Sequence, residues 1–344
     1  MAVLKLARHA MATRFEIVLY GDQPVSLRAA GEEALDEIER LEFQLSLFKP
    51  ASEIARLNAH AGHGPVRVTP AVFGLLQHAR RLTEETQGAF DITIAPLVRC
   101  WGFMGGSGHF PNPEDLAAAR AKVGMHFVHL DQDEFSVRFE HEGVMIDLGA
   151  IGKGYAIERA AEILRDAGVT SALLHGGTST IYGLGHPPEA DSWKIEIPDP
   201  LNPGAAAVPG PAAAPNPCDG GVSQSSSLER SSNLGSAPFA TVALRDASLS
   251  VSAVWGKFFQ VQGRKLGHIL DPRSGEPANG ALMAAVALPS ATETDALSTA
   301  LLTLGVPGHE DIASLRPQIR TLVVGESNGK LQVKSHGIAI EKPS

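Results

Sequence analysis

The sequence has few cysteines, fewer basic than acidic residues and no long apolar run, and each shortage excludes a class of protein. The two cysteines, Cys100 and Cys218, fit neither a zinc-binding spacing nor a disulfide framework. Only 29 lysines and arginines stand against 38 acidic residues, and the net charge of −9 argues against nucleic-acid binding because it repels polyanions. The apolar runs are far shorter than the ~20 residues of a membrane-spanning helix, so we expect no membrane span.

The composition is otherwise that of a soluble globular protein. Hydrophobic residues make up 44% and charged residues 19% of the 344 residues, which excludes a disordered or fibrous chain. A chain of this length can bury a sizeable core, either as one large unit or as two lobes. The first 21 residues lack the apolar region of a signal peptide and alternate like a strand from Thr13 to Tyr20. We therefore expect a soluble, cytoplasmic enzyme.

Apolar periodicity predicts most of the secondary structure. A helix follows the first strand, and a second helix begins at Thr69-Pro70, where the threonine caps it, and stops at Gly88. Residues 143–183 are predicted to form a strand, a glycine-rich turn, a helix ending at Gly168 and a further strand. The last hundred residues alternate as strands and include one helix over 294–304. The apolar face of the first helix contains Ala34, Leu35, Ile38, Leu41 and Leu45.

One segment, residues 199–238, does not fit this pattern. It contains 7 Pro, 5 Gly, 7 Ala and 7 Ser, too little apolar surface to offset the entropy of ordering it. Because strand-like sequence resumes on both sides, we expect a flexible surface insertion within one domain that spans 1–344. A linker between two domains is the alternative.

The segment Asp147–Tyr155 (DLGAIGKGY) is the most informative motif. An acidic residue ends a predicted strand, and three glycines lead into a helix with Lys153 at its start. Free backbone N–H groups and the positive end of the helix dipole favour a phosphate there, and the lysine adds a full charge. The Ser or Thr that follows the lysine of a P-loop is missing, and an ordinary tight turn is the alternative.

Two further motifs contain candidate metal ligands and a candidate general base. Asp295 and Thr299 lie four residues apart on a predicted helix and share one face, where their oxygens could bind Mg²⁺ or serve only the helix itself. His268 precedes the Asp-Pro-x-x-Gly turn at 271–275, and its pKa near neutrality suits a general base. His126 and His129 lie three apart on a predicted strand and face opposite sides, which argues against a metal pair.

These motifs, in this order, resemble those of the ApbE-like flavin transferases, the FAD:protein FMN transferase family. The resemblance extends over almost the whole chain outside 199–238. It rests on seven segments, MAT (11–13), SLFKPASEIARLN, GAFDITIAPLVRCWGF, DLGAIGKGYAIERAAEIL, HGGTSTIYGLG, HILDPRSGEP and TDALSTALLTLG. Each segment alone is a weak signal, whereas seven in order are a strong one.

The resemblance implies an α+β, T-fold-related architecture of mixed, largely antiparallel sheets with packed helices and FAD in a central cleft. It also implies that FAD is cleaved, that FMN is attached by a phosphoester bond to a Thr or Ser of a target flavoprotein, and that AMP is released. His268 and Asp295 would be catalytic. Mg²⁺ would be held by the Ala150 carbonyl, Asp295 and Thr299, and FAD would contact Met11, Phe48, Ala89, Phe90, Asp91, Asp147, Lys153, His268 and Ile269.

Several positions depart from the family pattern. The chain has Thr178 where members often have Asp. It reads Ser252-Ala-Val-Trp255 where members often have Ser-Gly followed by an aromatic residue. It has Thr292 where some members have an acidic residue. Many members are exported lipoproteins, whereas this N-terminus shows neither a signal nor a lipobox cysteine. The departures bear on metal affinity and acceptor docking. They leave two alternatives open, an FAD pyrophosphatase that uses water as acceptor and a non-catalytic FAD-binding protein.

Overall fold

The structure is a computed structural model, and it describes residues 1–105, 108–177, 179–201, 238–254, 258–261 and 264–341. Most of the predicted insertion at 199–238 therefore lies outside the described residues, as do Thr178, Trp255 and Cys218. Among the helices that are described, none is both long enough and apolar enough to cross a membrane.

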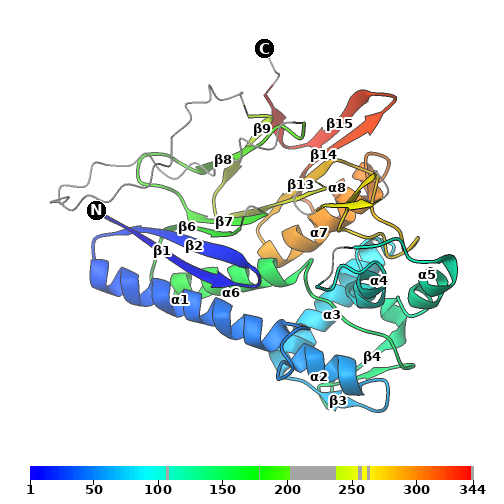
Figure 1. The fold of residues 1–344 in the computed structure, drawn as a ribbon. Helices are drawn as coiled ribbons and strands as arrows, with labels where there is room; N and C mark the ends of the chain where they lie inside the picture. Colours follow the sequence, from blue (N-terminus) through cyan, green and yellow to red (C-terminus); the bar gives the residue numbers. More distant parts are fainter. Residues whose placement is uncertain (106–107, 178, 202–237, 255–257, 262–263, 342–344) are drawn as a thin grey trace, which may run out of the picture.

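A single eight-stranded sheet forms the centre of the fold (Figure 1). Every neighbouring pair in it is antiparallel, and the first two strands join through a two-residue turn at Met11-Ala12. In spatial order the strands are β1 (Ala2–Ala10), β2 (Thr13–Gly21), β6 (Ser171–Gly176), β7 (Thr180–Gly185), β10 (Ala247–Ala253), β13 (Met283–Leu288), β14 (Arg320–Ser327) and β15 (Lys330–His336).

The two faces of this sheet are covered differently. Helices α1 (Pro24–Leu45), α6 (Gly152–Asp166) and α7 (Ala291–Leu304) pack on one face and bury the larger apolar core. On the other face, a second apolar core lies under the three-stranded sheet of β8 (Trp193–Ile197), β9 (Ala240–Leu244) and β16 (Ala339–Ile340). Two apolar faces explain why the central strands β13 and β14 are buried almost throughout.

A smaller helical part flanks the sheet beyond α7 (Figure 1). Its helix α3 (Pro70–Glu85) packs against α7, and its sheet is formed by β3, β5 and β4. Between α1 and α6 the chain also forms α2 (Glu53–His60), β3 (Val66–Arg67), η1 (Ile92–Ile94), α4 (Ala95–Cys100), α5 (Pro113–Arg120), η2 (Met125–Phe127), β4 (Val128–Asp131) and β5 (Ser136–Phe139). Later in the chain it forms β11 (Phe258–Val261), β12 (Arg264–Gly267) and α8 (His309–Ala313).

Most predicted elements are confirmed, and so is the α+β class with largely antiparallel sheets. The Thr69 hydroxyl accepts the Val72 N–H and caps α3 as predicted, and every residue of the predicted apolar face of α1 is buried. Helix α7 begins three residues earlier than expected because Ser290 caps it. The first strand, β1, and helix α2, which lies between the two predicted helices, were not predicted.

The predicted strand before the glycine-rich turn was wrong. Residues 144–148 belong to no strand and no helix. The Asn58 side chain accepts the Ile146 N–H at 2.7 Å and donates to the Ile146 carbonyl at 2.8 Å, and the Asp147 N–H donates to the Ile92 carbonyl at 2.7 Å. One side-chain amide thus satisfies the backbone groups that a neighbouring strand would otherwise satisfy.

Candidate functional site

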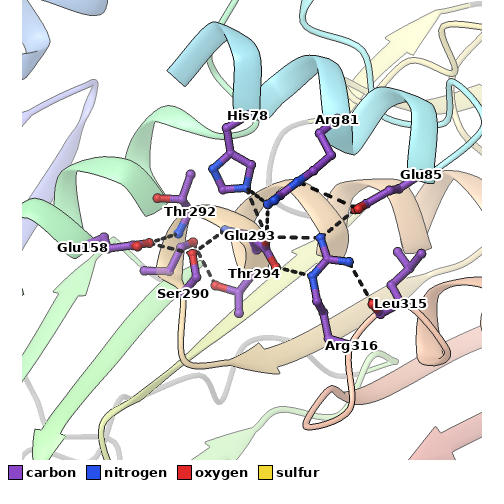
Figure 2. A network of polar contacts seen from close by, with 11 residues as sticks. His78, Arg81, Glu85, Glu158, Ser290, Thr292, Glu293, Thr294, Leu315 and Arg316 are labelled. Atoms are coloured by element: carbon purple, nitrogen blue, oxygen red, sulfur yellow. Dashed lines mark hydrogen bonds and ion pairs between the residues drawn. The ribbon is translucent and has the colours of Figure 1, made fainter. Parts of the chain in front are cut away.

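Helix α7 is fixed at its start by α6. The Glu158 carboxylate of α6 accepts hydrogen bonds from the Ser290 hydroxyl at 2.8 Å and from the Thr292 N–H at 2.7 Å (Figure 2). Ser290 in turn accepts the Glu293 N–H. These contacts satisfy free N–H groups of the first turn of α7 and hold the two helices in one register.

The two helices touch where α6 begins, and this contact requires glycine at position 154. A Cβ on Gly154 would lie 2.1 Å from the Ala291 carbonyl oxygen and 2.7 Å from the Cβ of Asp295, closer than real atoms approach. The Gly154 N–H instead donates to Oδ2 of Asp295 at 3.0 Å. The carboxylate of α7 therefore lies on the positive end of the α6 dipole.

Asp295 is the buried acid of this contact, with only 3% of its surface exposed. Its Oδ1 accepts hydrogen bonds from the Thr180 hydroxyl at 3.3 Å and the Ser250 hydroxyl at 3.5 Å. Its Oδ2 lies 3.6 Å from the Nζ of Lys153. The carboxylate is thus positioned by an amide and two hydroxyls and is paired with one partly exposed cation.

Lys153 binds the glycine-rich turn as well. Its Nζ donates to the Gly149 carbonyl at 3.0 Å, next to Ala150. The Gly149 N–H donates to Oδ1 of Asp147 at 2.8 Å, which ties the predicted flavin-contacting acid to the same turn. Burial raises the pKa of the Asp147 carboxyl, and the Gly149 amide and the Lys153 charge oppose that rise in part. Asp147, Lys153 and Asp295 therefore belong to one polar cluster, and Ala150 follows Gly149 of this cluster in the chain.

Thr299 joins this cluster through the helix and a serine of β10. Its hydroxyl donates to the Asp295 carbonyl at 3.2 Å, and Oγ of Ser252 lies 3.4 Å away. The predicted shared face of Asp295 and Thr299 is therefore present, with the threonine also bonding its own backbone. Because the hydroxyl hydrogen serves the carbonyl, oxygen lone pairs of Thr299 are left for another ligand.

The hydroxyls that surround Asp295 were not predicted as site residues. Ser248, Ser250 and Ser252 alternate along β10 and face α7, where the first contacts Thr294, the second Asp295 and the third Ser298. A serine at every second position of a buried strand was the available signal, because successive side chains on a strand point to opposite faces. Only the fold reveals that they meet α7.

The predicted Ala89-Phe90-Asp91 turn is largely enclosed by protein. Ala89 and Phe90 are 1% and 2% exposed. The Asp91 carboxylate accepts the Thr93 N–H and hydroxyl on one oxygen and the Met125 N–H on the other. Burial raises the pKa of the Asp91 carboxyl, and the hydrogen bonds from Thr93 and Met125 lower it in part. In this structure Asp91 acts first as the cap of η1.

Contacts connect this turn to two of the other motifs. Asp147 is bonded to Ile92, the residue after the turn, and a Cβ on Gly88, the residue before it, would meet the Arg273 side chain at 3.7 Å. Arg273 belongs to the Asp-Pro-x-x-Gly turn that follows His268 and Ile269. Both of these residues are partly buried, and Ile269 packs against the larger core. Three motifs that are far apart in sequence thus lie side by side.

Met11 and Phe48 occupy different surroundings. Met11 and Ala12 form the β1–β2 turn with φ of 49° and 58°, a left-handed conformation that Asn and Gly usually supply. Met11 packs against the larger core. Phe48 is 68% exposed on the connection between α1 and α2. Strain of this kind concentrates at functional sites, which fits a binding role for the Met11 turn.

A separate cleft of about 690 Å³ opens beside α3. Asp91 lines it together with Arg80, His126, His129 and Arg273, whereas Lys153 and Asp295 are not among its described lining residues. His126 belongs to η2 and not to a strand as predicted, and His129 belongs to β4. Across the described ranges, no group of three or more His, Cys, Asp or Glu side chains is placed to hold a metal ion.

Comparisons with known proteins agree with these motifs. A relative from Treponema pallidum named FAD:protein FMN transferase is 27% identical over 313 residues, which cover 87% of this chain and 78% of the relative. One of the same name from Haemophilus influenzae is 26% identical over 95% of this chain and 88% of the relative. The crystal structure of the ApbE protein of Thermotoga maritima has a TM-score of 0.78 at 25% identity and covers 99% of this chain and 97% of that chain.

The flavinyl transferase ApbE of Pseudomonas stutzeri, solved in its apo form, has a TM-score of 0.77 at 26% identity over 98% of this chain and 95% of its own. These two structures confirm the fold over almost its whole length. The sequence model of the ApbE family matches residues 11–323, which confirms the resemblance seen in the motifs. The chain belongs to the ApbE family.

Proposed function

We propose that this protein is an FAD:protein FMN transferase. It cleaves the pyrophosphate of FAD, attaches FMN by a phosphoester bond to a Thr or Ser of an acceptor flavoprotein, and releases AMP. Membership of the ApbE family and the shared name of the relatives support the flavin chemistry. The observation that carries the proposal is the buried Asp295 carboxylate, which meets Lys153 and the N-terminus of α6 at one point.

This arrangement suits a pyrophosphate. Negative charge develops on the bridging oxygen and on the leaving AMP during the transfer, and preorganised donors stabilise such charge without reorganising. The N-terminus of α6 and the Lys153 ammonium supply positive potential at one end of a glycine-rich turn. We assign Asp147, Lys153, Ile269 and the Met11 turn to FAD binding, together with Phe48 and the Ala89–Asp91 turn.

The polar cluster also fits Mg²⁺. A cation already lies there, because the Lys153 ammonium contacts the Gly149 carbonyl and the Asp295 carboxylate. The hard oxygens of Asp295, Thr299 and the Ala150 carbonyl are the ligand types Mg²⁺ takes, and an incomplete protein shell suits it because water and phosphate oxygens complete the six. When bound, Mg²⁺ would neutralise charge on the pyrophosphate.

His268 is the proposed proton acceptor for the attacking hydroxyl. It lies three residues before Asp271, where the turn beside Gly88 begins, and it is only partly buried, so an acceptor side chain could approach it. Asp271, the nearest carboxylate in the chain, is held by two hydrogen bonds of 2.9 and 2.8 Å from the Arg273 guanidinium. Both oxygens of the Asp271 carboxylate are thus already engaged by the guanidinium, which favours the histidine as proton acceptor.

One experiment tests the proposal and separates it from the alternatives. The protein is incubated with FAD, Mg²⁺ and an acceptor flavoprotein, and AMP release is measured together with flavin fluorescence in a denaturing gel. AMP with a fluorescent acceptor supports the transferase. AMP with free FMN would establish a pyrophosphatase instead, and binding without AMP would establish a flavin-binding protein. A Ser/Thr→Ala acceptor variant is the control, because it has no hydroxyl to modify.

A further inference from the structure

We propose that Lys153 and a divalent cation are alternative partners of Asp295, so that Lys153 becomes available to the FAD phosphates only when the cation is bound. This inference rests on the proposed function and extends it to how the two ligands are coupled. Lys153 is then a positioning residue with two states, one facing Asp295 and one facing the pyrophosphate. The position of its ammonium group in the present structure is the starting observation.

The Lys153 ammonium occupies the place that a cation would take. Its two oxygen contacts come from Gly149, which directly precedes Ala150, and from Asp295. Ala150 and Asp295 are two of the three residues that we assign to the metal. An ammonium group and a divalent cation repel each other strongly at such short range, so both cannot contact the Asp295 carboxylate at this position at once.

The mobile partner of the pair is the lysine and not the carboxylate. The Asp295 side chain is 5% exposed, and its oxygens are fixed by the Gly154 N–H and by the hydroxyls of Thr180 and Ser250. The Lys153 side chain is 24% exposed, and its Nζ lies 3.6 Å from the carboxylate. A flexible four-carbon side chain can leave such a contact with little disturbance to the fold.

The competing interpretation is that Lys153 and Asp295 form a permanent ion pair. The contact between Arg316 and Glu293 of α7 is an example of such a pair. The Arg316 guanidinium approaches the two Glu293 oxygens at 2.9 and 3.2 Å and also binds Glu85 at 2.6 Å. Its geometry is bidentate and doubly anchored, which is typical of a structural pair. The Lys153 ammonium instead approaches one Asp295 oxygen at 3.6 Å, and its second contact is a neutral carbonyl, so this pair is the more readily exchanged.

The exchange has two measurable consequences of opposite sign. Without FAD, Lys153 competes with the metal, so removing its charge should strengthen metal binding. With the metal bound, the displaced ammonium remains at the start of α6 and can approach an anionic ligand. Removing its charge should then weaken FAD binding. A permanently paired lysine would instead hold Asp295 in place, and its loss would not strengthen metal binding.

The first test is calorimetric titration of Mg²⁺ into the protein without FAD. Lys153→Met should bind Mg²⁺ about tenfold more tightly than the wild type, equal to about 1.4 kcal/mol. Lys153→Arg keeps the charge and should show no such gain. Lys194→Met removes a charge from an exposed position of β8 and is the matched control. Equal or weaker Mg²⁺ binding by Lys153→Met, or no binding by any variant, would overturn the proposal.

The second test measures FAD affinity with and without Mg²⁺ by stopped-flow quenching of flavin fluorescence, before turnover. Lys153→Met should weaken FAD binding at least tenfold with saturating Mg²⁺ and less than about threefold without it. The same loss in both conditions would contradict the exchange. Both tests are independent of transfer to an acceptor, so the proposed function can hold while this inference fails, and the melting temperature of each variant confirms its folding.

Discussion

Two acidic residues of α7, only two positions apart, are held in opposite ways. Glu293 is surrounded by two guanidinium groups and an imidazole, with Arg81 at 2.6 Å, Arg316 at 2.9 Å and His78 at 3.1 Å (Figure 2). Within the part of the chain that the structure describes, Asp295 has one ammonium group at 3.6 Å and otherwise neutral donors. The Glu293 carboxylate is therefore fully paired, whereas the Asp295 carboxylate can still bind another cation.

The difference appears in the electrostatics of Glu293. Burial would raise the pKa of its carboxyl, but the hydrogen bonds and charges of His78 and Arg316 outweigh burial and lower the pKa to about 2. The network also includes Glu85 of α3, which binds Arg316. It therefore connects α3 to α7. Because the Gly88–Asp91 turn directly follows α3, this network helps to set the place of that turn relative to Asp295.

The comparison suggests that Glu293 stabilises the fold and Asp295 serves the reaction. The strongest test of this division of roles is Asp295→Ala, which should abolish AMP release and make FAD binding insensitive to Mg²⁺. The melting temperature without ligand should change little, because the lost contacts of the carboxylate are offset by the relief of burying it. The measurements are AMP release and FAD titration with and without Mg²⁺.

The control for this prediction is Asp166→Ala, which removes an exposed acid at the other end of α6 and should leave both ligands unaffected. Two results would contradict the assignment. Turnover of FAD by Asp295→Ala would remove the metal role, and unfolding would show that Asp295 is a structural residue like Glu293.

The next largest effect concerns His268. If the imidazole accepts the proton of the attacking hydroxyl, His268→Asn should lower the transfer rate by ~10²–10⁴ and leave FAD affinity unchanged. Single-turnover transfer and FAD titration are the measurements. The matched control is His129→Asn, an exposed histidine of β4, which should transfer at the wild-type rate. A wild-type rate in His268→Asn would assign the proton to Asp271 or to the acceptor itself.

Glu293→Gln tests the other side of α7. Removing the charge leaves the partly buried Arg316 guanidinium without the carboxylate that it binds through two nitrogens. This loss should lower the free energy of unfolding by about 3 kcal/mol and the melting temperature by roughly 5–10 °C. Transfer by the folded variant should be unchanged, opposite to the result expected for Asp295→Ala. Urea unfolding and transfer kinetics below the melting temperature measure the two effects. Loss of transfer at full stability would contradict the division of roles.

The same network predicts a pH dependence. The pKa of Glu293 is lowered in the folded protein, so its contribution is fully present above the ordinary value of 4.5 and is lost as the pH falls through about 2. The contribution is at most about 3 kcal/mol. The difference in unfolding free energy between wild type and Glu293→Gln should therefore shrink as the pH falls below 4.5. A constant difference from pH 7 to pH 2 would exclude this cause.

Local sequence patterns predicted the parts of the fold that depend on local physics. The Thr69 cap, the apolar face of α1 and the stop at Gly168 each follow from residues within a few positions of one another. The strand expected before the glycine-rich turn failed because Asn58, which is 88 positions away from Ile146, satisfies its backbone. β1 gave a weak signal because it is an edge strand of the central sheet and few of its residues are buried.

The site was predictable only in pieces. Spacing placed Asp295 and Thr299 on one helical face and Lys153 at the start of another helix. Neither pattern indicates that α6 and α7 meet at Gly154, because that contact depends on the packing of both helices on the sheet. The family resemblance grouped the motifs, whereas the hydroxyls of Thr180 and Ser250 became visible only once β7 and β10 were placed beside α7.

The smallest expected effect concerns Lys153, the cation that Asp295 contacts. With Mg²⁺ present, Lys153→Ala should weaken FAD binding about tenfold to a hundredfold, because charge-assisted phosphate contacts contribute roughly 1.5–3 kcal/mol each. Riboflavin has no phosphate, so its affinity should change less than about twofold. Fluorescence titration of both ligands into wild type and variant measures this ratio. An equal loss for both would place Lys153 against the isoalloxazine ring, and no loss for either would make it a structural partner of Asp295, as Arg316 is for Glu293.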